Sequence, residues 1–274
     1  MHVANANMSF HSHHPPVTAY CIWNDEHGVR LQGYNGQKAS ISKTLTINIK
    51  QVGHALLHIN EFNEDYLITL PNLHIEGVYG GAPFVELNSA SYITSSSGFT
   101  GKIDYSGRGW ISGKKNTFSA TLYRTDKPKD VLFYVDGQWN DSFKIKDAKK
   151  NEIDVYEAKK APVTPLTIAP IEEQHELETR RAWQHVAAGI SKGDMDTTQA
   201  EKSKIEESQR EMRRKEKEAD TQWERKFFKR VDKDEAFDKL APKLGIVADP
   251  KQTDGMWVWD QAKADKAVPP CPSS

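Results

Sequence analysis

Apolar and polar side chains alternate with a period of two residues in the first half of the chain. In the stretch 41–49 serine, threonine and asparagine occupy the even positions, and the apolar residues share the other face: Ile41, Leu45, Ile47 and Ile49. Such a period is typical of a half-buried β-strand. We therefore predict a strand across this whole stretch.

Similar runs recur from residue 17 to about residue 145, separated by Gly, Asn, Asp and Pro residues that favour turns. They are Val17–Trp23, Val29–Tyr34, Tyr66–Leu70, Phe84–Ile93, Phe118–Tyr123 and Val131–Trp139. Many consecutive strands with short connections predict an antiparallel meander, and a meander this long usually curls or closes. The sequence thus predicts a large antiparallel β-barrel, or most of one.

Beyond the proline-rich stretch 161–170 the apolar period becomes helical. One apolar stripe contains Trp183, Val186, Ala187 and Ile190, and Gly193 stands where a helix would stop. Thr198, with a glutamate three residues later, has the pattern of a capping box. We expect it to open a second, very polar helix that runs to about residue 230, followed by a frayed tail from residue 263.

Composition excludes several classes of function. The 37 Lys and Arg residues nearly balance the 38 Asp and Glu residues, so the chain lacks the field that would hold nucleic acid. Any anion site must be local. The two cysteines, Cys21 and Cys271, lie far apart and no apolar run approaches the roughly 20 residues of a membrane span. These features indicate a reducing, cytosolic compartment, and the absence of nucleophile and metalloprotease motifs argues against an enzyme.

Three histidines, His11, His13 and His14, precede Pro15 and Pro16. Three interpretations remain open on these residues. The histidines could hold a metal, although such a site wants further ligands at fixed spacing. They could lie in a solvated loop that leads into a strand. They could also bind an anion, because the prolines hold the chain extended and each imidazole can donate a hydrogen bond to a phosphate.

Lys202, Glu206 and Arg210 recur every four residues and form a ladder along one face of the polar helix. The ladder could be an ordinary surface array of ion pairs, which contributes little to stability. Alternatively, the two cations could clasp a phosphate while the glutamate orients them.

The run from Ser106 to Lys115 resembles a phosphate-binding loop, but Arg108 stands where the Walker pattern needs glycine and Lys115 where it needs Ser or Thr. It also lies between two predicted strands, with no helix after it. We interpret it as a turn.

The run His13-His14-Pro15-Pro16 and the residues that follow it resemble the fingerprint Glu-Gln-Val-Ser-His-His-Pro-Pro of the oxysterol-binding protein family. The resemblance covers about residues 12 to 262 and is closest to the short fungal members. It continues through Leu31–Asn35, Leu73–Gly77, Pro83–Leu87, Ser106–Gly109, Ser112–Asn116, Gly137–Trp139 and Glu172–His175.

The resemblance implies a near-closed antiparallel barrel around a tunnel, with carboxy-terminal helices packed outside. It implies a carrier that exchanges a sterol for phosphatidylinositol 4-phosphate between membranes and associates transiently with endomembrane surfaces. We expect no cofactor and no metal. By this similarity the headgroup contacts would be His13, His14, Lys202, Glu206 and Arg210. The polar tunnel groups near the sterol hydroxyl would be Asn35 and Gln51.

The match breaks at the amino terminus, where Ser9, Phe10 and His11 replace Glu-Gln-Val of the fingerprint. Family members carry a lid, helices and the first barrel strands before it, so we expect an incomplete barrel with an unpaired edge and poor lipid transfer by the isolated chain. Two alternatives stay open: a phosphoinositide-sensing module, and a fragment that needs a separate amino-terminal segment. The expected organisation is 1–11 outside the family, 12–160 barrel, 161–262 helical portion and 263–274 frayed tail.

Overall fold

The computed structural model describes residues 4–13, 16–42, 46–78, 81–107, 113–163, 166–176, 178–221, 225–247, 250–253 and 255–267. Most of the described strands join one 13-stranded sheet, in the order β12-β11-β10-β9-β8-β7-β5-β4-β3-β2-β1-β13, with β6 paired to β4 and β7. Neighbouring strands are antiparallel except for β1 and β13, which are parallel. The predicted antiparallel, mainly β architecture with carboxy-terminal helices is confirmed.

The sheet strands are β1 (Ala4–His13), β2 (Pro16–Asn24), β3 (Val29–Ile41), β4 (Ile47–Ile59), β5 (Glu64–Thr69), β6 (Asn72–Glu76), β7 (Phe84–Ser95), β8 (Phe99–Tyr105), β9 (Thr117–Arg124), β10 (Val131–Gln138), β11 (Ser142–Asp147), β12 (Glu152–Glu157) and β13 (Leu166–Thr167). A second, two-stranded sheet pairs β14 (Phe228–Val231) with β15 (Met256–Trp259). The helices are η1 (Ile171–Glu173), α1 (Thr179–Ala182), α2 (Gln184–Lys192), α3 (Met195–Glu218), α4 (Glu235–Leu240), η2 (Ala241–Leu244), η3 (Pro250–Gln252) and α5 (Gln261–Ala267).

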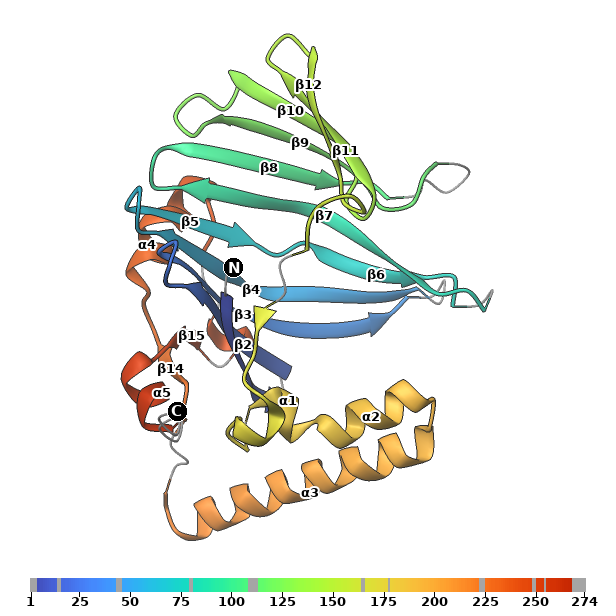
Figure 1. Ribbon diagram of the computed structural model, residues 1–274, viewed down its shortest axis with the longest axis vertical. Helices are drawn as coiled ribbons and strands as arrows, with labels where there is room; N and C mark the ends of the chain where they lie inside the picture. The colour runs from blue at the N-terminus through green and yellow to red at the C-terminus, as the bar shows by residue number, and fades with distance from the viewer. Residues whose placement is uncertain are drawn as a thin grey trace.

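The large sheet curls, and the carboxy-terminal elements β14, β15, α4 and α5 lie outside the curl, beside its lower left part (Figure 1). They pack on one face, which we call the outer face. The core joins outer-face residues to carboxy-terminal residues: Val17, Ala19, Cys21, Tyr34, Leu56 and Leu67 with Phe227, Phe228, Phe237, Leu240, Met256 and Trp257. Since side chains alternate along a strand, the residues between these point to the opposite face, which we call the inner face.

The helices follow the sequence pattern in part. Gly193 ends α2 in the left-handed conformation, as predicted. The expected capping box at Thr198 is wrong, because Asp194 is the N-cap of α3 and its carboxylate accepts a hydrogen bond from the Thr197 N–H at 2.9 Å. Thr198 instead lies against Gly189 of α2, where an added Cβ would come within 2.6 Å of the Thr198 hydroxyl. Its role is helix packing rather than capping.

Other boundaries also differ from the predictions. The stretch 41–49 is not one strand, because β3 ends at Ile41 and β4 begins at Ile47. Ser42 N–H donates to the Thr46 carbonyl at 2.9 Å, which links the two arms of a hairpin, and Leu45 lies outside the described residues. The polar helix ends at Glu218 rather than near residue 230. The tail from residue 263 is helical as far as Ala267. None of the helices in the described ranges is long and apolar enough to span a bilayer.

Candidate functional site

The inner face of the large sheet is apolar over most of its strands. The register of the paired strands places these residues on it: Leu31, Ile49, Leu57, Ile68, Ile93, Ile103, Leu122 and Val135. Most are only half-buried, whereas the outer-face residues of the core are buried. A broad apolar face that remains partly exposed is typical of a surface that binds another molecule.

Two polar side chains, Asn35 of β3 and Gln51 of β4, lie together on this face. Asn35 Nδ2 donates to Gln51 Oε1 at 2.7 Å, and Gln51 Nε2 donates to the Pro71 carbonyl at 2.5 Å. The backbone N–H of Gln51 donates to Asn72 Oδ1 at 3.1 Å. The resemblance to the family predicts the first two residues as a group, and the structure brings them into contact.

These hydrogen bonds determine which atom of the pair lacks a partner. The Pro71 carbonyl can only accept, so Gln51 must donate its amide hydrogen there and turn its oxygen toward Asn35. Asn35 then uses its amide nitrogen, and its buried Oδ1 has no hydrogen-bond partner in the described part of the chain. A buried acceptor without a donor is costly. The site is therefore suited to a ligand hydroxyl or to a water that the ligand contacts.

A row of aromatic rings crosses the inner face farther along the sheet. In register, Tyr105 pairs with Phe118, Phe118 and Phe143 both pair with Gly137, and Phe143 pairs with Tyr156. The Phe118 and Phe143 ring centroids are 5.5 Å apart, and those of Phe143 and Tyr156 are 4.9 Å apart. The rings meet across Gly137, where an added Cβ would lie 2.6 Å from Phe143 Cβ. The row extends the apolar surface to β12.

The predicted ladder lies on α3 and forms long ion pairs. Lys202 Nζ is 3.7 Å from Glu206 Oε1, and Arg210 Nη2 is 3.6 Å from Glu206 Oε2. Hydrogen-bonded ion pairs of this kind are about 2.8 Å long, so Glu206 bridges the two cations only loosely. Both cations are exposed, whereas Glu206 is half-buried. The structure thus places the three residues together, and their binding role stays a prediction.

The histidine pair lies at the junction of β1 and β2. His13 is the last residue of β1 and pairs with Pro16, but its side chain lies outside the described residues, as does all of His14. The predicted meeting of the imidazoles with the α3 ladder therefore also stays a prediction.

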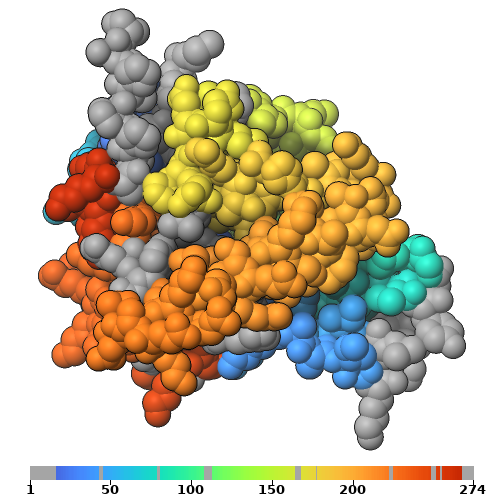
Figure 2. Space-filling model, turned by 90° about the horizontal axis from the view of Figure 1, so that it is seen from below, coloured from blue at the N-terminus to red at the C-terminus, as the bar shows by residue number. Residues whose placement is uncertain are grey.

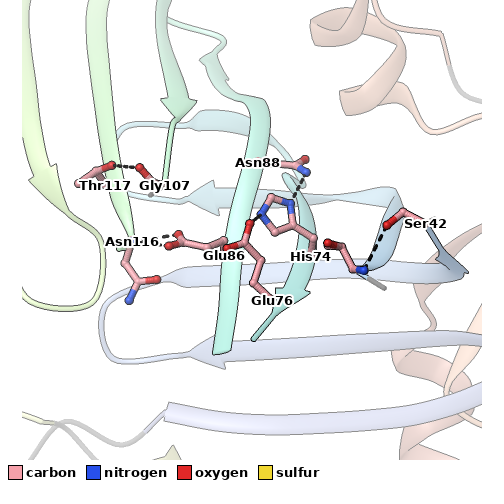
Figure 3. A network of polar contacts seen from close by, with 9 residues as sticks. Ser42, His74, Glu76, Glu86, Asn88, Gly107, Asn116 and Thr117 are labelled. Carbon is pink, nitrogen blue, oxygen red and sulfur yellow. Dashed lines mark hydrogen bonds and ion pairs between the residues drawn. The ribbon is translucent and has the colours of Figure 1, made fainter. Parts of the chain in front are cut away.

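The loop that resembles a phosphate-binding motif connects two strands, as expected. β8 ends before it and β9 begins after it, and residues 108–112 lie outside the described part of the chain. Glu86 is buried beside the flanking residues, and both its carboxylate oxygens accept from the Asn116 N–H, at 3.1 and 2.9 Å (Figure 3). A buried carboxylate at this position disfavours a phosphate. The segment between β8 and β9 is therefore still interpreted as a turn rather than as a nucleotide site.

Asn72 and the aromatic row were not predicted from the sequence. The sequence marks Asn72 only as a turn residue after Pro71, although its side chain also donates to Ser89 Oγ at 3.3 Å. The aromatic residues are visible as strand residues, but their contacts depend on the register of five strands. Their spacing along the chain carries no signal for the row.

Comparison with known proteins identifies the family. Residues 11–189 match the family model described as oxysterol-binding protein. The chain is 44% identical over 232 residues to Protein kes1 of Schizosaccharomyces pombe, covering 83% of this chain and 60% of that protein. It is 39% identical over 264 residues to "Probable transporter efuK" of Hormonema carpetanum, covering 94% of this chain and 38% of that protein.

Solved structures show the same fold. The Osh1 ORD domain in complex with ergosterol has a TM-score of 0.70 and 17% identity, with 98% of this chain and 67% of that chain covered. The Osh3 ORD of Saccharomyces cerevisiae in complex with PI(4)P has a TM-score of 0.63 and 18% identity, with 82% of this chain and 62% of that chain covered. The chain spans less than two thirds of the length of the curated relatives named above. On the family-model match, the chain belongs to the oxysterol-binding protein family.

Proposed function

We propose that this chain binds a sterol and phosphatidylinositol 4-phosphate, one at a time, and exchanges them between membranes without catalysing a reaction. The observation that carries the proposal is the unpaired, buried Asn35 Oδ1 on a sheet face that is apolar over most of its strands. A sterol is an apolar body with a single hydroxyl, and it supplies the donor that this acceptor lacks. The Osh1 ORD domain was solved in complex with ergosterol, which supports this class of ligand.

The charges of the predicted headgroup residues favour phosphatidylinositol 4-phosphate as the second ligand. A phosphomonoester carries about −1.5 to −2 charges at pH 7, which suits two imidazoles together with the ammonium and guanidinium groups on α3. We assign this role to His13, His14, Lys202 and Arg210, with Glu206 orienting the two cations. The Osh3 ORD was solved in complex with PI(4)P, which supports the choice of headgroup.

Exchange follows from competition for one apolar surface. The sterol and the acyl chains of the phosphoinositide would both need the inner face, so each would exclude the other. The inner face need only be as apolar as a bilayer, because a lipid then loses little free energy on transfer. We place the protein in the cytoplasm, at the surface of endomembranes.

Two variants test the sterol contact and the headgroup contact separately. Asn35→Leu should weaken sterol binding by about tenfold, because it removes the hydroxyl acceptor while keeping the branching and number of heavy atoms of the side chain. His13→Ala/His14→Ala should abolish phosphoinositide binding and leave sterol binding unchanged. The measurements are fluorescence titration with dehydroergosterol and sedimentation with vesicles that contain phosphatidylinositol 4-phosphate.

Each variant is the control for the other, because both must remain folded to bind the ligand that they still recognise. If Asn35→Leu bound sterol as the parent chain does, the assignment of the inner-face acceptor would be wrong. Phosphoinositide binding by the parent chain without any sterol binding would instead identify a sensing module.

A further inference from the structure

Four aliphatic side chains lie in one row at the end of the inner face. Ile41 pairs with Ile47, Ile47 pairs with Ile75, and Ile75 pairs with Val85, across β3, β4, β6 and β7. We call this row the lip. The two residues at its ends are the most open to solvent, since Ile41 is 72% exposed and Val85 is 43% exposed. Isolated exposed aliphatic residues are common, but a row of four in register forms a continuous apolar edge.

The lip is continuous with the surface that we propose as the lipid site. The next inner-face row consists of Ala39, Ile49, Leu73 and Leu87, which are paired in the same register. Beyond it on the same face lie Gln37 and Gln51, which pair across β3 and β4. Asn35 follows, six residues from Ile41 and therefore about 20 Å along β3. An apolar surface thus runs from the edge of the sheet to the polar pair without a change of face.

The opposite side of the same two strands is cationic. Lys38 and Lys50 are cross-strand partners, and both ammonium groups donate to Gln252 Oε1, at 3.3 and 3.5 Å. The carboxylate of Glu76, at the end of β6, is 3.1 Å from His74 Nε2 (Figure 3). The lip therefore has an apolar edge, with two ammonium groups and one carboxylate on the opposite face, which matches the order of acyl chains and zwitterionic headgroups at a bilayer surface.

The lip also occupies a projecting part of the molecule. In Figure 2 the ends of β3 and β4, in blue, and the segment around β6 and β7, in teal, reach one corner of the molecule. Figure 1 shows the same strand ends at the right side of the sheet, away from the elements that cover the outer face. The strand ends that carry the lip therefore lie on the outside of the molecule, where a membrane can approach them.

We propose that the lip inserts into the surface of a bilayer and thereby joins the inner face directly to the acyl-chain region. This inference rests on the proposed lipid-binding function and adds the surface through which the lipid enters. Without this insertion, a sterol leaving the membrane would cross water before it reached the inner face. The exposure of its apolar body to water would raise the free-energy barrier to extraction. The occupant is the bilayer itself, rather than a partner protein.

The test replaces the two exposed ends of the lip. Ile41→Ser/Val85→Ser should reduce partition onto phosphatidylcholine vesicles by about tenfold or more, because it removes two aliphatic side chains from the lip. It should slow extraction of dehydroergosterol from the same vesicles to a similar extent. Uptake of dehydroergosterol delivered from cyclodextrin should fall less than extraction from vesicles, since that route bypasses the bilayer.

The matched control is Val163→Ser/Val247→Ser, which removes two aliphatic side chains that are 88% and 87% exposed elsewhere on the chain. Equal vesicle partition by the lip variant and this control would overturn the inference. Failure of the parent chain to bind sterol from cyclodextrin would overturn the proposed function instead, and vesicle partition would then still report on the lip. Ile41→Leu/Val85→Leu, which keeps the lip aliphatic, should partition onto vesicles as the parent chain does.

Discussion

Gly53→Ala should destabilise the fold by about 3 kcal/mol or more. Gly53 has φ +128°, and an added Cβ would lie only 2.1 Å from the Tyr34 carbonyl oxygen. That oxygen belongs to the backbone of β3 at a buried core residue, so it cannot move aside as a flexible side chain would. The free energy of unfolding, measured in denaturant, should fall accordingly.

The expected damage also reaches the site, because Gly53 pairs directly with Asn35. Gly98→Ala is the matched control: its φ is +92°, but an added Cβ there would meet nothing within 4 Å. It should cost only the conformational penalty of about 1–2 kcal/mol. Equal losses of stability in the two variants would show that the close approach of β3 and β4 at Gly53 is not a determinant of the fold.

Acidification should destabilise the chain by about 3 kcal/mol through His54 alone. Burial lowers the pKa of His54 from 6.5 to about 4. The imidazole is stacked on Phe237 of α4, with ring centroids 4.3 Å apart, and meets Tyr34 edge-on at 5.0 Å. The contribution of the neutral His54 to the free energy of unfolding is complete above pH 6.5. It is lost as the pH falls to about 4, because the unfolded chain binds the proton at a higher pH than the folded chain does.

His54→Phe keeps an aromatic ring in this stack and removes the titration. Its free energy of unfolding should therefore fall less steeply between pH 6.5 and pH 4 than that of the parent chain, by about 3 kcal/mol over the interval. The measurement is a series of denaturant unfolding curves across this pH range. Identical pH dependence in the two proteins would mean that His54 does not couple the docking of α4 to protonation.

The sequence predicted much of the sheet because the two-residue period survives wherever one face of a strand is buried. In the stretch 41–49 the same period led to the wrong prediction of one continuous strand, for a physical reason. Ile41 and Ile47 are direct partners across the hairpin, so both belong to the inner face and the alternation continues through the turn. The missed strand β1 also alternates, Ala-Asn-Ala-Asn-Met-Ser-Phe-His, and that signal could have revealed it.

The candidate site was predictable only in part. Asn35 and Gln51 came from the resemblance to the family, but the unpaired oxygen follows from the orientation of Gln51 toward Pro71, which depends on how β4 meets the residues before β6. The lip could be identified only once the register of four strands was known. Neither feature has a signature in the local sequence, since each joins residues that are distant in the chain.

The most direct test of lipid exchange is competition on one chain. The parent protein is loaded with dehydroergosterol, and vesicles containing phosphatidylinositol 4-phosphate are then added while sterol fluorescence and bound phosphoinositide are both recorded. If the inner face serves both lipids, sterol should leave in a one-to-one ratio with phosphoinositide uptake. Retention of sterol on chains that have taken up phosphoinositide would contradict a single shared site.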